Sequence, residues 1–413
     1  PGNAVRSALT REGNLLRIGS QHFQLDMLSN IYIVAFGKAA PAMAEATREI
    51  LGSFLSGGIV VSKYESSFAL DGLSLHTAGH PVPDGRSQLA AESVWRLLTG
   101  SGENDLVLFL ISGGGSALIT SPIANVSLSD LKKLTSLLLG CGARIDEINV
   151  LRRALDRIKG GGLARCAYPS KQVSLILSDV VDSPIEAIAS GTTVTNPTSN
   201  ADARAILEKY DLLSQTPPPI MTALAQSDTQ KHTPTGEVII VGSNRISAEA
   251  ARYAAQREGF DAHVMTTTLQ GEAAEKGREL ALSLLAAEER PLCLIVGGET
   301  TVTLVSDPGE GGRNQEMALS AVEVLDGANN RLFITVATDG DDGPTDAAGA
   351  VVSGETYARA KMFGLDPQVY LSTHNSYAFF NALGDLLKPG PTGTNVNDLI
   401  FLFTFSPKKC RIL

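Results

Sequence analysis

The chain has 413 residues, of which 43% are hydrophobic and 19% charged, and its formal net charge at pH 7 is −10. This length exceeds what one hydrophobic core usually covers, so we expect two globular domains. The negative charge argues against nucleic acid and anionic membranes as partners. A small anionic substrate stays compatible with it only if the chain builds a local basic pocket.

Cysteine usage indicates a reducing compartment. The four cysteines are widely spaced, form no CxxC pair and have no histidine at ligand spacing: Cys141, Cys166, Cys293 and Cys410. We therefore expect neither a zinc site nor a disulfide framework, and a cytoplasmic location. Because the chain opens with Pro1-Gly2 and no methionine, a removed leader and a mitochondrial location are the alternative. The sequence leaves monomer and homodimer open.

Short apolar runs alternate with Ala- and Leu-rich segments of helical period along the chain. The runs predict strands at 31–36, 58–61, 106–111, 173–177, 238–241, 263–265, 292–296, 332–336 and 399–403. Helices are expected at 41–51, 89–98, 128–139 and 247–257. This alternation is the βαβ signature of parallel sheets and predicts an α/β fold.

A polar stretch at residues 226–236 follows the triplet Pro217-Pro218-Pro219 and is the best linker candidate. We place the domain boundary near residue 235. The two predicted domains are then 1–235 and 236–413.

A lysine stands where the first predicted strand meets the first predicted helix. The order Phe36-Gly37-Lys38-Ala39 puts Lys38 at a helix start, where free N–H groups and the helix dipole favour anions. Lys38 is therefore a candidate clamp for a phosphate or carboxylate. The loop is not a Walker A motif, because Tyr32 and Ala39 replace its required glycine and hydroxyl residue. A solvated lysine at an ordinary helix start is the alternative.

Three glycines follow the predicted strand at 106–111. Gly113, Gly114 and Gly115, with Ser116 after them, form a turn in which backbone N–H groups can approach an anion without a Cβ in the way. A tight turn without a ligand is the alternative. The dinucleotide fingerprint fails because Leu118 stands at its last glycine position, which disfavours a nicotinamide cofactor.

An aspartate follows the predicted strand at 173–177. Asp179 could accept a proton from a substrate hydroxyl or hold a metal ion. A helix N-cap is an equally good interpretation from the sequence alone.

The second half carries two further polar segments. Glu299 follows the predicted strand at 292–296, and Arg313 and Asn314 follow two glycines at an expected helix start. The planar guanidinium of Arg313 suits a bidentate grip on a carboxylate or phosphoryl group, and a surface ion pair is the alternative. His374 is more simply interpreted as a structural histidine than as a catalytic one.

An acidic loop follows the predicted strand at 332–336. Asp339, Asp341, Asp342 and Asp346 lie close together among glycines, and such carboxylates repel one another unless a cation lies among them. Magnesium, which takes one or two carboxylates plus phosphate oxygens, or an arginine would fit. A calcium loop is disfavoured because Pro344 stands where an EF-hand needs glycine, and a solvated turn is the remaining alternative.

The chain contains nine motifs in this order: VAFGKAAPAM, GHPVPD, LISGGGSALI, INVLRRALDRIKGGGLA, LILSDVVDSPIEAIASGT, IVGGETTVTL, GGRNQEMAL, ATDGDDGPTDAAGAVV and TGTNVNDLIF. Together they resemble the class II glycerate kinases, the glycerate 2-kinases of the MOFRL family. The resemblance implies an N-terminal Rossmann-like parallel sheet with flanking helices, a C-terminal α/β MOFRL domain, and an active site in the cleft between the domains.

The resemblance also implies an activity. It is phosphorylation of D-glycerate at the 2-hydroxyl by ATP with magnesium, which gives 2-phosphoglycerate and ADP. Lys38, Asp179 and Arg313 would be the catalytic set. The implied substrate- and ATP-binding residues are Gly113, Gly114, Gly115, Ser116, Glu299, Asn314, Thr338 and Asp339. Our hypothesis for the metal is that Asp339, in the acidic loop, helps to hold magnesium.

The chain departs from the family pattern at Asp182-Ser183, where the family has Gly-Asp, at Thr192, where it has Pro, and at Ala337, where Gly is common. Asp179 is unaffected. Two other functions stay open from the sequence. A hydroxypyruvate reductase using NAD(P)H would need a nicotinamide site, which we do not find. A catalytically silent small-anion binding protein is disfavoured because Lys38, Asp179 and Arg313 are all present.

Overall fold

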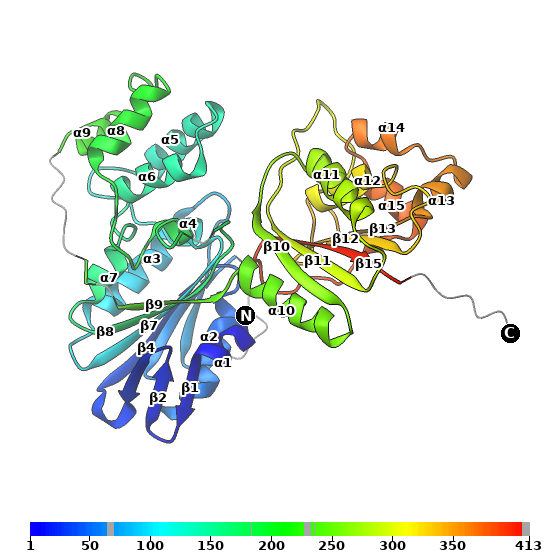
Figure 1. Ribbon diagram of the computed structural model, residues 1–413. Helices are drawn as coiled ribbons and strands as arrows, with labels where there is room; N and C mark the ends of the chain where they lie inside the picture. The colour runs from blue at the N-terminus through cyan, green and yellow to red at the C-terminus, as the bar shows by residue number, and fades with distance from the viewer. Residues whose placement is uncertain (64–69, 183, 227–232, 235, 407–413) are drawn as a thin grey trace. The chain divides into compact units, whose positions relative to one another are not determined.

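The computed structural model describes residues 1–63, 70–182, 184–226, 233–234 and 236–406 (Figure 1). The chain forms two compact units, Pro1–Gly242 (unit 1) and Ser243–Leu413 (unit 2). The expected boundary near residue 235 lies a few residues before the one in the structure. The difference arises because the apolar run after residue 235 forms strand β9 (Glu237–Gly242) and pairs with the sheet of unit 1. Most of the expected linker, and Cys410, lie outside the described residues.

Unit 1 is built on a six-stranded sheet in which every pair of neighbouring strands is parallel, as predicted. Its order is β6 (Leu73–Thr77), β5 (Gly57–Ser62), β4 (Asn30–Phe36), β7 (Asp105–Ser112), β8 (Lys171–Leu177) and β9. All residues of β7 are buried, because a central parallel strand is covered on both faces and therefore carries a continuous apolar run.

The helices of unit 1 form two groups. Those that belong with the sheet are α1 (Gly2–Ala8), α2 (Ala40–Leu51), α3 (Gly85–Thr99), α4 (Gly115–Leu118) and α7 (Gly162–Ala167). Figure 1 shows a separate helical lobe of α5 (Leu128–Gly140), α6 (Ile145–Leu155), α8 (Asn200–Lys209) and α9 (Pro218–Leu224). The lobe has a core of its own, which includes Leu134, Leu138, Leu151 and Ile220. A small antiparallel sheet of β1 (Leu9–Glu12), β2 (Leu15–Ile18) and β3 (Gln21–Gln24) completes the unit.

Unit 2 contains a mixed six-stranded sheet, and here the expectation of parallel strands is wrong. The order is β10 (Asp261–Leu269), β11 (Leu292–Gly298), β15 (Asp398–Thr404), β12 (Arg331–Ala337), β13 (Gly349–Ser353) and β14 (Leu386–Leu387). Only β10 and β11 pair in parallel, because the last long strand, β15, enters between β11 and β12 and runs antiparallel to both.

Helices cover both faces of this sheet (Figure 1). One core contains residues of α11 (Ala273–Ala286), α12 (Arg313–Ala321), α13 (Thr356–Met362) and α15 (Ser376–Leu383), beside which α14 (Pro367–Ser372) packs. A second core joins the sheet to α10 (Asn244–Arg257). Val296 belongs to the first core and Ile295 to the second, as expected for side chains that alternate along a strand.

The element predictions are confirmed at all nine apolar runs and all four helical segments, with ends that shift by a few residues. Among the described residues, no helix combines the length and apolar character needed to cross a membrane.

Candidate active site

The loops that follow three neighbouring strands of unit 1 come together. Lys38 follows β4, Gly113–Gly115 follow β7, and Asp179 follows β8. Parallel strands end at the same edge of a sheet, which is where ligands of α/β sheets bind. The backbone N–H of Lys38 donates to the carbonyl of Gly113 (2.9 Å), and the N–H of Ala39 donates to the hydroxyl of Ser112 (3.0 Å). The first two loops are thus joined by hydrogen bonds.

Asp179 lies against the glycine loop. A Cβ on Gly113 would be 1.9 Å from one carboxylate oxygen of Asp179, so only glycine admits this side chain. No helix begins at Asp179, and the N-cap interpretation does not apply. Burial raises the pKa of Asp179, against the effects of its own backbone N–H and of the Lys38 charge, which lower it. The arrangement is a carboxylate held near an exposed lysine.

Lys38 has a second neighbour that the sequence interpretation did not assign. A Cβ on Gly114, whose φ is +81°, would be 2.8 Å from the His80 ring and 3.6 Å from Cγ of Lys38. Burial, together with the charges of Lys38 and Lys63, lowers the pKa of His80 to about 4. The imidazole is therefore neutral at pH 7. The motif GHPVPD, which contains His80, was the available signal, but it carried no chemical pattern of its own.

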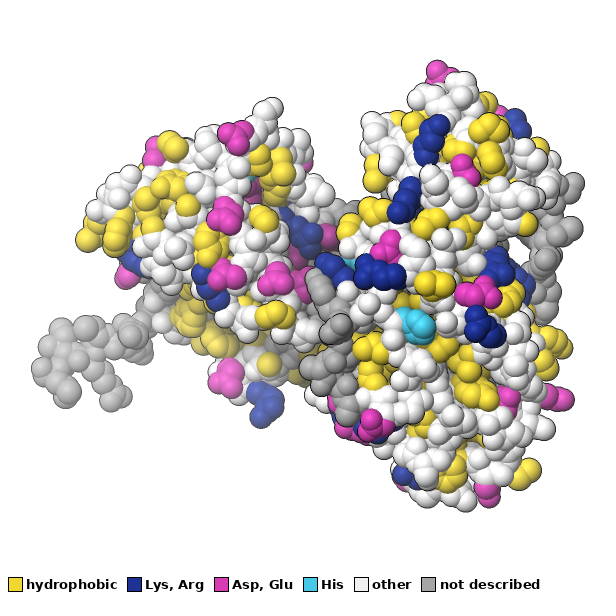
Figure 2. Space-filling model, turned by 180° about the vertical axis from the view of Figure 1, so that it is seen from behind, with side chains coloured by type: hydrophobic (Ala, Val, Ile, Leu, Met, Phe, Trp, Pro, Cys, Tyr) yellow, Lys and Arg dark blue, Asp and Glu magenta, His cyan; other side chains and the backbone are white. Residues whose placement is uncertain are grey.

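Ser116 ends the glycine loop in the one-turn helix α4. Its hydroxyl lies 2.8 Å from that of Ser190, which in turn donates to the side-chain oxygen of Asn149 (3.0 Å). This hydrogen-bonded chain leads from the loop to α6. Figure 2 shows several Lys and Arg side chains spread across the middle of unit 1, below the helical lobe. The same view shows Asp and Glu side chains among them.

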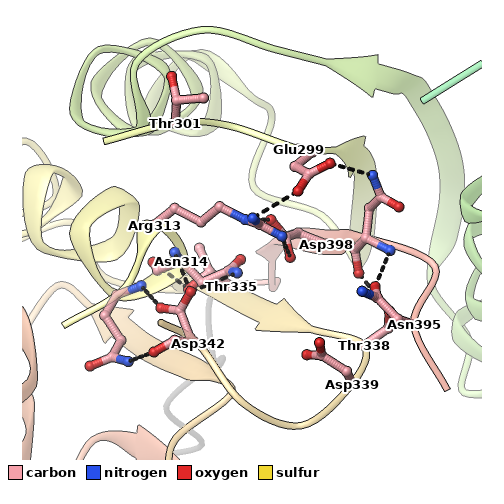
Figure 3. Close-up of polar contacts among 12 residues, drawn as sticks. Glu299, Thr301, Arg313, Asn314, Thr335, Thr338, Asp339, Asp342, Asn395 and Asp398 are labelled. Atoms are coloured by element: carbon pink, nitrogen blue, oxygen red, sulfur yellow. Dashed lines mark hydrogen bonds and ion pairs between the residues drawn. The ribbon is translucent and has the colours of Figure 1, made fainter. Parts of the chain in front are cut away.

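In unit 2 the polar contacts among the predicted site residues centre on Arg313, the first residue of α12 (Figure 3). Its Nε and Nη2 donate to the two oxygens of Asp398 (2.6 and 3.1 Å), and its Nη1 donates to Glu299 (2.8 Å). Burial alone would lower the pKa of Arg313, but the hydrogen bonds and charge of Asp398 and the charge of Glu299 outweigh it and raise the pKa. An arginine has five N–H donors, so two remain for a ligand.

Asp398 is a partner of Arg313 that the sequence analysis did not assign. It is the first residue of β15 and pairs in register with Gly298 of β11 and Ala337 of β12. The neighbouring Asn397 donates its side-chain amide to Glu299 (3.0 Å). The motif TGTNVNDLIF, which contains Asp398, was the available signal, but nothing in it indicates which strands β15 separates.

The acidic loop after β12 does not bring its carboxylates together. Asp342 accepts the backbone N–H groups of Asn314 (3.1 Å) and Gln315 (2.8 Å), so it caps α12. Burial raises its pKa to about 6. Asp346 instead accepts from the hydroxyl of Tyr377 (2.8 Å) and pairs with Lys388 (3.0 Å). The repulsion expected from the sequence is relieved by a helix N-terminus and a lysine.

The remaining predicted residues of unit 2 lie around this loop. Thr338 donates its hydroxyl to the carbonyl of Asn397 (2.6 Å) and accepts the N–H of Val396 (2.9 Å). Asn314 is 1% exposed, and its side-chain N–H₂ faces Asp342 (3.3 Å). Their contacts in this structure are therefore with the protein itself, and ligand binding by either stays a prediction.

Asp339 is half-buried at the end of β12. The part of the chain that the structure describes has no cluster of three or more acidic, His or Cys side chains arranged for a metal. Magnesium often uses one or two protein carboxylates and takes its other oxygens from phosphate and water. Asp339 fits that use as a single protein ligand, and the assignment stays a prediction.

Comparison with known proteins decides the family. A model described as a domain of unknown function (DUF4147) matches residues 1–225, and the MOFRL family model matches residues 292–398. The glycerate 2-kinase of Pyrococcus horikoshii is 40% identical, over 99% of this chain and 94% of that protein. The D-glycerate 2-kinase of Thermotoga maritima is 43% identical, over 90% of each. The chain belongs to the glycerate 2-kinase family.

The fold agrees with this family. The crystal structure of the Thermotoga maritima glycerate kinase matches with a TM-score of 0.86 at 42% identity, over 91% of this chain and 92% of that one. The expected α/β architecture of two domains is thereby confirmed.

Proposed function

We propose that this glycerate 2-kinase family member transfers the γ-phosphoryl group of ATP to the 2-hydroxyl of D-glycerate, giving 2-phosphoglycerate and ADP. The observation that carries the proposal is the pair of Lys38 and Asp179, which follow the two strands on either side of β7, in a chain 43% identical to a D-glycerate 2-kinase. Phosphoryl transfer asks a protein mainly for positioning and charge neutralisation, which such a pair supplies.

Asp179 accepts the proton of the 2-hydroxyl. A general base works best when its pKa lies near the working pH, and burial moves the pKa of Asp179 in that direction. Lys38 carries its charge on an exposed side chain that forms no ion pair within the described part of the chain. It is therefore available to an anionic oxygen of the substrate or of the transferring phosphoryl group.

Arg313 contributes its remaining N–H donors to a carboxylate or phosphoryl oxygen, while Asp398 and Glu299 fix its orientation. Asp339 would hold the magnesium ion, whose chemistry is to neutralise phosphate charge. Glu299 and Thr338 complete the polar surface around Arg313 and Asp339 (Figure 3).

The test is an assay of the purified chain with ATP, magnesium and D-glycerate, with ADP release as the readout. The product is identified by adding enolase alone, because enolase converts 2-phosphoglycerate directly and leaves 3-phosphoglycerate unchanged. A matched reaction with hydroxypyruvate and NADH measures the reductase alternative. ADP release without phosphoenolpyruvate would contradict transfer to the 2-hydroxyl, and NADH oxidation without ADP release would contradict the kinase.

A further inference from the structure

Unit 1 contains a cavity of about 360 Å³ beside the glycine loop. One wall is made by Ser116 and Ala117 of α4 and by Pro81–Pro83, which directly follow His80. The opposite walls are the facing sides of α5 and α6, with Leu134, Leu138 and Leu151 among the lining side chains. Through Ser116 the cavity borders the glycine loop, against which Asp179 and Lys38 lie. Its size lies in the range of ~300–1,000 Å³ typical of small-molecule pockets.

The chemistry of this cavity does not suit D-glycerate. All three carbons of glycerate carry oxygen, so the molecule has almost no apolar surface to bury. The walls supplied by α5 and α6 are mostly leucine and isoleucine side chains. A planar aromatic group with polar edges is a better occupant, because its faces gain from leaving water. In the proposed reaction only the purine base of ATP has this character.

One end of the cavity is polar and positively charged. Arg152 of α6 lines it and donates from Nη1 to the side-chain oxygen of Asn149 (3.3 Å), the same oxygen that accepts from Ser190 (3.0 Å). The guanidinium thus lies at the end of the chain of hydrogen bonds that begins at Ser116 of the glycine loop. Over the described ranges Arg152 has no carboxylate partner, and burial lowers its pKa. A half-buried cation without a counter-charge favours an anionic ligand.

Of the two other basic groups that line the cavity, Lys132 and Lys159, the second is already neutralised. Lys159 is 3% exposed and pairs with Asp156 (3.0 Å), while it also donates to the carbonyls of Ser116 (3.0 Å) and Ile119 (3.1 Å). It holds the end of α4 in place. Among the described residues, the cations of this cavity without a carboxylate partner are therefore Arg152 and Lys132 of α5.

We propose that this cavity is the base subsite for the nucleotide. The purine of ATP lies between α5 and α6, and the phosphates extend past Arg152 and Ser116 towards Gly114 and Lys38. The inference rests on the proposed use of ATP and goes beyond it by naming where the nucleotide binds. The base subsite also explains how this chain binds ATP without a Walker A loop. Contacts between the purine and the helical lobe supply the affinity for the nucleotide that a phosphate-binding loop supplies in other kinases.

The first experiment fills the cavity. Thr135 of α5 lines it and is half-buried, whereas Lys133 of the same helix is exposed and does not line it. Thr135→Trp should raise the KM for ATP by roughly tenfold or more and leave the KM for D-glycerate unchanged, because only base contacts are lost. Lys133→Trp, the matched control, should leave both values at those of the unsubstituted chain.

The second experiment separates base from phosphate. Adenosine carries the base but no phosphate, so Thr135→Trp should weaken inhibition by adenosine. Arg152→Gln should leave adenosine inhibition intact while raising the KM for ATP. Equal adenosine inhibition in Thr135→Trp and in the unsubstituted chain would overturn the base subsite.

The third experiment needs no variant and tests binding without turnover. Photolabelling with 8-azido-ATP should mark the peptides of residues 128–155, and ATP should protect them. Labelling elsewhere, with normal kinase activity, would overturn the base subsite and leave the proposed function standing. If the chain does not phosphorylate D-glycerate, the proposed function fails, and ATP-protected labelling of 128–155 would still support a nucleotide subsite. A chain that neither phosphorylates D-glycerate nor shows ATP-protected labelling would refute both.

Discussion

The substitution Arg313→Lys tests the centre of unit 2 because it keeps the charge and removes the planar fork. In the structure Arg313 makes two hydrogen bonds to Asp398 and one to Glu299. An ammonium group cannot reproduce the parallel pair on Asp398, whose side chain is only 4% exposed. Both the stability of unit 2 and the orientation of the remaining donors should therefore change.

The magnitudes follow from these contacts. Hydrogen bonds to charged groups contribute ~1.5–3 kcal/mol each. With the charge retained and Arg313 itself 31% exposed, the loss of one to two such bonds should lower the free energy of unfolding by ~1–3 kcal/mol. Catalytic efficiency should fall by about ten- to a hundredfold or more, which corresponds to at least ~1.4–2.7 kcal/mol of lost transition-state stabilisation.

Arg331→Lys is the matched control. Arg331 lies in the same unit and donates to the carbonyls of Leu284 (3.0 Å), Leu285 (3.0 Å) and Ala287 (2.9 Å), and it pairs with Glu289 (3.1 Å) at the end of α11. Its substitution should cost similar stability and leave kcat/KM unchanged. Thermal melts and steady-state kinetics at a temperature where both variants are folded provide the comparison. If Arg313→Lys matches Arg331→Lys in both respects, Arg313 is a structural ion pair and our assignment is wrong.

Four further outcomes are expected. Lys38→Ala should abolish turnover with little change in melting temperature, because the side chain is exposed, and normal turnover would remove Lys38 from the site. Asp179→Asn should lower kcat steeply and abolish the acidic limb of the pH–rate profile, whose midpoint lies above the pKa of an ordinary carboxyl group because Asp179 is buried. Full rescue of the variant by excess magnesium would instead identify Asp179 as a metal ligand. Gly113→Ala should impair kcat by displacing the Asp179 carboxylate, which would be 1.9 Å from the new Cβ, whereas Gly140→Ala, with nothing within 4 Å, should not; equal kinetics would show that Asp179 need not stay in place. Burial raises the pKa of Asp342 from the ordinary value of 3.8 to about 6 in the folded state, so protonation of Asp342 stabilises the fold by ~3 kcal/mol below pH ~4, and this contribution is lost as the pH rises through 6. Asp342→Asn should therefore remove this pH dependence of the free energy of unfolding, measured by denaturant titration at several pH values. An unchanged pH dependence would contradict the assignment.

Local features of the sequence determined much of this protein. Period and composition located the strands and helices, since side-chain alternation and apolar runs are imposed by neighbouring residues. The grouping of the site residues of unit 1 could also be predicted from the sequence. Lys38, Gly113 and Asp179 each follow a predicted strand, and if those strands are parallel neighbours their ends must meet.

The tertiary structure decided what depends on strand order. Arg313 meets Asp398, a residue 85 positions away, only because β15 enters the sheet of unit 2 between β11 and β12. No local pattern encodes that insertion, because strand order is settled by the burial of whole faces. The same holds for the acidic loop, where short-range repulsion suggested a shared cation. In the fold, Asp342 turns to the start of α12 and Asp346 to Lys388, since each carboxylate finds its counter-charge on a segment distant in sequence.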